Sequence, residues 1–213
     1  MFKAPSKKIP DDFRITVEGH SIKPVVSVKL LGLHLDQHFV WDVHIDHVVK
    51  KCHGLLGALT KAAPSLTREL RRLAYTALIR SHLEYCSAII HSASRTQLGK
   101  LDVIQKIASR IICDAPRDAH AAPLLESLSL KSLEERRSDH ILSTVINIVS
   151  GNCHPAFKDY FQLAADETIS AIHSRLKMGN KRFKIIGASI YNQHLQTRGN
   201  RNGSQQDGEP LCQ

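Results

Sequence analysis

The spacing of apolar residues changes once along the chain, near residue 41, and this change constrains the fold more than any other feature. Before it, residues 13–17 and 22–35 are rich in β-branched side chains and are separated by a turn at Glu18-Gly19-His20, a pattern that predicts short strands. After it, apolar residues recur every three or four positions, which predicts helices. We therefore expect a mainly α fold, with a small N-terminal β-hairpin or three-stranded element followed by a helical bundle.

The predicted helices are bounded by residues that end helices. The first runs from about 41 to 62 before Pro64, the second from about 67 to 90, and the third from about 96 to 113 before Pro116. A fourth begins after Ser132, which can form a capping box with Glu135, and ends at Gly151. Residues 183–195 are compatible with a strand or a last helix. The predicted division is a β element at 1–40, a helical region at 41–195 and a disordered tail at 196–213.

Each predicted helix has an expected buried face. In the first helix Gly54 and Gly57 lie within the apolar pattern, and we expect them to allow close packing of another helix. In the third helix Ile104 is expected to be buried. The second helix is expected to bury a row of apolar residues: Leu66, Leu70, Leu73, Ala77, Leu78, Tyr85, Cys86 and Ile89.

Charge points to a polyanionic partner. The 213 residues include 29 Lys and Arg against 20 Asp and Glu, which gives a net charge of +9. This balance favours nucleic acid over a membrane, because no segment is apolar enough to span a bilayer. The residues we expect to follow a phosphate backbone lie on the second and third predicted helices: Arg68, Arg72, Arg80, Lys106 and Arg110. A solvated helix face, or a protein that is merely basic, would give the same pattern.

Cysteine and histidine usage does not indicate a metal centre or a disulfide framework. Five Cys occur without a CxxC pair, and the N-terminus has no signal-peptide pattern, so an intracellular location is expected, in the nucleus or the cytoplasm. One stretch is rich in possible ligands, namely His34, His38, His44, His47, Cys52 and His53. Their spacing matches no zinc finger, and no metal site is predicted.

Four segments resemble, in the same order, the non-LTR retrotransposon (jockey- and LINE-like) reverse transcriptases. The first, residues 30–45, reads LLGLHLDQHFVWDVHI, and the second, residues 73–86, reads LAYTALIRSHLEYC. The third, residues 101–110, reads LDVIQKIASR, and the fourth combines LLESL at 124–128 with LEERR at 133–137. Residues 183–193 match the family's closing motif more faintly, with Tyr191 where the family usually has Trp. The resemblance covers about residues 20–195.

The resemblance implies that the chain corresponds to the exit of the polymerase palm, the thumb and the helices that follow. Leu31, Gly32 and Leu33 would then form the turn that positions the primer end. The expected partners are an RNA–DNA hybrid or template RNA, together with the palm and fingers of the polymerase. We also expect the apolar face of the β element to be exposed, because its parent sheet is missing from this chain.

The same resemblance places the catalytic carboxylates, which hold Mg²⁺ in the parent polymerase, upstream of this chain. Asp11-Asp12 follows Pro10 in a polar stretch and does not fit the paired hairpin of such a site. No catalytic residue is therefore predicted, and the chain alone is expected to be inactive. The alternatives are a remnant helical module that binds proteins, or a transposon-derived reading frame without a selected function.

Overall fold

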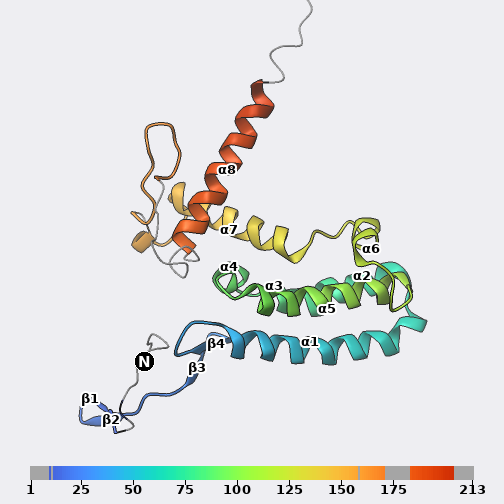
Figure 1. Cartoon of the computed structure of the whole chain (residues 1–213), viewed down its shortest axis with the longest axis horizontal. Helices are drawn as coiled ribbons and strands as arrows, with labels where there is room; N and C mark the ends of the chain where they lie inside the picture. The colour runs from blue at the N-terminus through green and yellow to red at the C-terminus, as the bar shows by residue number, and fades with distance from the viewer. Residues whose placement is uncertain (1–9, 11, 158, 171–182, 204–213) are drawn as a thin grey trace, which may run out of the picture. The chain divides into compact units, whose positions relative to one another are not determined.

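The computed structural model describes residue 10 and residues 12–157, 159–170 and 183–203. It is mainly helical, and the strands of the described residues all lie in the N-terminal part, as the sequence predicts (Figure 1). The chain divides into two compact units. The first comprises residues 1–86 and 93–133, and the second comprises 87–92 and 134–213. The predicted boundary at residue 40 falls inside the first unit.

The β structure consists of two separate antiparallel hairpins. Strands β1 (Ile15–Val17) and β2 (His20–Ile22) form the first, and their turn uses Glu18 and Gly19, both with positive φ. Strands β3 (Ser27–Leu30) and β4 (Leu33–Asp36) form the second, and Leu30 pairs with Leu33. β1, β2 and β3 are exposed along their whole length, whereas β4 buries both its ends.

Helix α1 (Asp42–Ala62) packs mainly against α5 (Arg95–Cys113) and also contacts β4. It buries Ile45, Cys52, Leu56 and Leu59, which lie on the face that the sequence predicts. The expectation for its glycines is wrong. A side chain added at Gly54 or Gly57 would meet nothing within 4 Å, so both face open space in the part of the chain that the structure describes.

The second predicted helix is divided, and its predicted face is wrong. It consists of α2 (Arg68–Ala74), a π-helical segment η2 (Tyr75–Arg80) and α3 (Ser81–Glu84), with α4 (Ser87–Ile90) after a break. The buried side chains are Tyr75, Ile79 and Leu83. The row predicted to be buried includes Leu73, which is 61% exposed, and also the exposed Leu70, Leu78, Tyr85 and Ile89.

Two physical reasons explain this error. The segment carries two apolar stripes, and the stripe that contains the large Tyr75 side chain fills the core instead of the leucine stripe. The π-helical turn also widens the helix locally, which shifts the later residues around the axis away from a 3.6-residue period. The continuous helix then stops at Glu84, because Tyr85 turns to ψ 123 and Cys86 adopts a left-handed conformation with φ 53.

Helix α5 follows its predicted face closely. The Ser94 hydroxyl caps its start by accepting a hydrogen bond from the Gln97 amide at 3.2 Å, and Asp114 ends it in a left-handed conformation. Ile104 is 0% exposed, and Leu101, Ala108 and Ile112 are buried beside it. The short helix α6 (Ala121–Ser127) then packs back on α5. The first unit therefore has its core between α1, η2 and α5.

The second unit is built on α7 (Leu133–Val149), a short 3-10 turn η3 (Pro155–Phe157) and α8 (Phe183–Gly203). Its core contains Ile141, Val145, Ile148, Phe161, Ile169 and Ala188. Gly151, with φ 73, follows α7, and the Asn152 amide donates to the Asn147 carbonyl, which is the predicted helix stop. Residues 183–195 are thus a helix, not a strand. Residues 196–203, the first part of the predicted tail, belong to α8, and residues 204–213 lie outside the described residues.

Candidate functional site

The turn between β3 and β4, Leu31 and Gly32, is the hairpin tip that the family resemblance identifies with primer positioning. Both residues have positive φ, 47 and 86, as a two-residue type I′ turn requires. Asn-Gly is the favoured sequence for such a turn, and a leucine at positive φ is strained. The Leu31 side chain is also 84% exposed. Leu33, in contrast, is buried at the start of β4.

Asp36 connects this hairpin to α1. Its buried carboxylate accepts hydrogen bonds from three backbone amides, those of His38 at 2.8 Å, Val40 at 3.2 Å and Trp41 at 2.9 Å. Phe39 and Trp41 both have positive φ, so this connection is strained. The carboxylate holds the strained residues in place at the start of α1. Asp36 is therefore a structural acceptor that the protein has already saturated with hydrogen bonds.

Three of the predicted possible metal ligands lie together where β4 meets α1. The ring centroids of His34 and His47 are 4.7 Å apart, and those of His34 and His44 are 6.3 Å apart. Burial is the main reason that the pKa values of His34 and His44 lie below the ordinary value, and their positively charged neighbours lower them further. The described residues contain no group of three or more His, Cys, Asp or Glu side chains suited to a metal ion.

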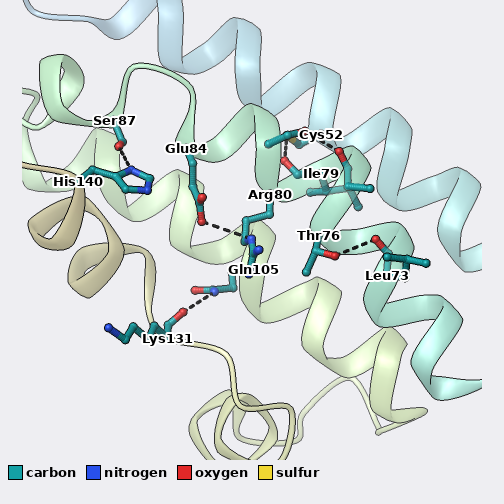
Figure 2. A network of polar contacts seen from close by, with 12 residues as sticks. Cys52, Leu73, Thr76, Ile79, Arg80, Glu84, Ser87, Gln105, Lys131 and His140 are labelled. Carbon is teal, nitrogen blue, oxygen red and sulfur yellow. Dashed lines mark hydrogen bonds and ion pairs between the residues drawn. The ribbon is translucent and has the colours of Figure 1, made fainter. Parts of the chain in front are cut away.

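Three of the five predicted nucleic-acid-binding residues bind protein groups. Arg68 donates to the Ser127 hydroxyl at 2.7 Å, and Arg110 donates from Nε to the Ala119 carbonyl at 2.9 Å. Arg80 forms an ion pair with Glu84, with 3.5 Å between Nε and Oε1 (Figure 2). These contacts join α2 to the end of α6, α5 to the loop before α6, and η2 to α3. A guanidinium has five donors, so these arginines still have donor capacity for a phosphate.

The other two predicted residues, Arg72 on α2 and Lys106 on α5, are exposed on helices that pack together in the first unit. Their positions leave the long side chains able to reach an external anion. Arg71, which the sequence analysis did not select, has an internal role. Its guanidinium donates to the carbonyls of Ala63, Leu66 and Ile111, which joins the end of α1 to the end of α5.

The motif on α5 is explained by contacts within the fold. Gln105 is buried and donates from its amide nitrogen to the Lys131 carbonyl at 3.0 Å (Figure 2). Arg110, five positions later, binds a carbonyl in the loop before α6. Gln105 and Arg110 of this motif therefore fasten the chain that follows α5 to the surface of the helix.

Sequence reasoning missed the role of Tyr85. Its hydroxyl donates to the Leu31 carbonyl at the hairpin tip, and its ring lies against Gly32, where an added Cβ would come within 3.4 Å of Tyr85 Cε1. The sequence pattern assigned this tyrosine to a buried helix face. The one available signal was Gly32, within the predicted strand region 22–35, because a glycine in such a region often marks a close approach of another group.

Asp12 is exposed, and Asp11, its neighbour in the pair rejected as catalytic, lies outside the described residues. Among the helices that the structure describes, none has the length and apolar character needed to cross a membrane.

Comparison with known proteins gives one curated relative. The chain is 24% identical over 129 residues to a protein of Drosophila melanogaster described as a probable RNA-directed DNA polymerase from transposon BS. The match covers 59% of this chain but 14% of the relative, so the chain corresponds to a small part of that protein. No family model and no solved structure matches the chain. The similarity supports a relationship between this chain and the reverse transcriptases of transposons.

Proposed function

We propose that the chain derives from the reverse transcriptase of a non-LTR retrotransposon of the jockey or LINE type, and that it corresponds to the palm exit, the thumb and the following helices. The observation that carries this proposal is the similarity to a transposon polymerase over more than half of the chain. The order of the four sequence motifs agrees with it. The catalytic carboxylates of such a polymerase are expected to lie outside this chain.

The proposed biochemical role is to hold an RNA–DNA hybrid through its phosphate backbone. The net charge of +9 supports a polyanionic ligand, and Arg72 and Lys106 are exposed members of the proposed surface. Arg68, Arg80 and Arg110 belong to the same surface, but each also binds a protein group. We therefore expect Arg72 and Lys106 to dominate the electrostatic part of binding.

The test is the salt dependence of binding to a labelled RNA–DNA hybrid. For duplex DNA each neutralised phosphate contributes about −0.9 to the slope of log affinity against log salt, so the double variant Arg72→Ala/Lys106→Ala should flatten the slope by roughly two units. Lys61→Ala is the matched control, because Lys61 is an exposed basic residue in the last turn of α1 and does not belong to the proposed surface. An unchanged slope in the double variant would remove both residues from the proposed surface.

Primer extension with Mg²⁺ separates binding from catalysis. The chain alone should extend no primer, because the two-metal chemistry needs carboxylates that we place outside it. Extension above the level of a heat-treated sample would contradict this part of the proposal.

A protein-interaction module is the second candidate, and one observation favours it. The first hairpin and β3 expose several large apolar side chains, among them Val17, Ile22 and Val28. Contiguous exposed apolar surface marks interaction sites. A chain with this function alone should not bind the hybrid at physiological salt, which distinguishes it from the first candidate.

A further inference from the structure

Two features of Leu31 at the hairpin tip are energetically unfavourable. Its backbone has φ 47, a conformation unfavourable for a bulky residue, and its apolar side chain is almost fully exposed. Neither feature helps the chain to fold, since asparagine would suit the same turn better. Strained residues persist where surrounding contacts fix them, and they occur preferentially at functional positions. Leu31 therefore needs a contact from elsewhere in the fold that fixes its backbone.

Tyr85 supplies that contact from the end of α3. The helix stops at Glu84, Tyr85 turns to ψ 123, and Cys86 takes a left-handed conformation. This break directs the phenol to the hairpin, where its hydroxyl donates to the Leu31 carbonyl and its ring covers Gly32. A phenol with an ordinary pKa near 10 keeps its proton at neutral pH and can donate, and the neighbouring Cys86 side chain raises the pKa of Tyr85 further.

We propose that Tyr85 is a positioning residue: it holds the Leu31–Gly32 tip in its strained conformation so that the exposed Leu31 side chain can contact bound nucleic acid. The binding part of this inference rests on the proposed function. The positioning part does not, because the contacts between Tyr85 and the tip lie within the first unit. A continuous helix through residue 86 would not direct the phenol to the hairpin. The break after α3 is therefore what allows Tyr85 to contact the tip.

The first experiment measures amide hydrogen exchange in the full chain. Tyr85→Phe removes the donor but keeps the ring against Gly32, so exchange over residues 27–36 should accelerate by about 2- to 10-fold, the equivalent of one net hydrogen bond. Exchange within α5 should not change. The matched control is Tyr160→Phe, a tyrosine of the second unit. Equal exchange over residues 27–36 in wild type and Tyr85→Phe would overturn the inference.

The second experiment measures affinity for the labelled RNA–DNA hybrid. Tyr85→Phe should weaken binding by a similar factor without changing the salt slope, because no phosphate contact is removed. Adding Leu31→Asn to Tyr85→Phe should restore slow exchange, since Asn-Gly favours a type I′ turn, but should not restore affinity. Restored affinity would show that the Leu31 side chain makes no contact, and unchanged affinity in Tyr85→Phe would show that the tip takes no part in binding. Either result would overturn the binding part.

Failure of the proposed function gives a different result. If the wild-type chain does not bind the hybrid, the proposed function is wrong, and the exchange data alone decide whether Tyr85 positions the tip.

Discussion

The two hairpins have similar strands in opposite settings. β1 and β2 expose all their residues, including Ile15, Val17 and Ile22, and their turn has open space around Gly19. In the second hairpin, β4 is covered by α1 and the tip is held by Tyr85. Two-stranded hairpins are marginally stable alone, so the difference shows that the helices, not the strand residues, stabilise the second hairpin.

The largest expected effect tests whether stability resides in the helices. Ile104→Ala should lower the free energy of unfolding by about 2–5 kcal/mol, because it leaves a cavity in the core of the first unit. Ile22→Ala in β2 is the matched control and should change it by less than about 0.5 kcal/mol. Denaturant unfolding measures both. Similar losses in the two variants would contradict the comparison.

A smaller loss is expected when the connection between β4 and α1 is broken. Asp36→Ala leaves three backbone amides without their acceptor and should lower the free energy of unfolding by about 1–3 kcal/mol. Asp42→Ala removes an exposed carboxylate from the first turn of α1 and should lower the free energy of unfolding by about 0.3–1 kcal/mol, through the helix dipole alone. If the two substitutions have equal effects in denaturant unfolding, the Asp36 hydrogen bonds do not stabilise the junction.

Stabilising α1 should favour the second hairpin over the first. Gly54→Ala places a methyl group in open space on a helix and should stabilise the protein by roughly 0.5–1 kcal/mol. Hydrogen exchange should become slower in α1 and β4 and remain unchanged in β1 and β2. Gly187→Ala provides a contrast in α8, because its Cβ would come within 2.8 Å of the Val145 side chain and should destabilise the second unit. A destabilising Gly54→Ala would show that an unobserved group packs there.

The smallest effect concerns pH. The lowered pKa of His34 means that the unfolded state binds protons more readily than the folded state. Stability is therefore fully present above the unfolded pKa of about 6.5 and decreases as pH falls below it. His34→Gln should reduce this dependence below about pH 6.5 in thermal unfolding, because it removes the group that titrates differently in the two states. A pH dependence unaffected by His34→Gln would exclude this histidine as its source.

The helices with one dominant apolar stripe were predictable from the sequence. Helix α1 ends at Ala62, two residues before Pro64, α5 ends at Cys113 before Pro116, and Ile104 lies in the core as its spacing predicts. Residues 67–90 were not predictable in the same way, because two apolar stripes compete there and periodicity cannot say which one a partner helix covers. The π-helical turn and the break at Cys86 have no signal in that periodicity.

The candidate site was predictable only in part. The glycine at the hairpin tip and the basic residues on two helices could be selected from sequence, but their partners could not. The contacts of Arg68 with Ser127 and of Tyr85 with Leu31 each join residues more than fifty positions apart. Such contacts depend on tertiary packing, which a single sequence does not specify. The roles assigned to Arg72 and Lys106 remain predictions.

The position of Asp36 has a consequence for the pairing of the second hairpin. The residue pairs with Ser27 as the last residue of β4, and its carboxylate binds the amides that lead into α1. A slip of one residue between β3 and β4 would turn every side chain of β4 to the opposite face and remove the carboxylate from these amides. The strand register and the first turn of α1 are therefore specified together, and an error in either should prevent the other from forming.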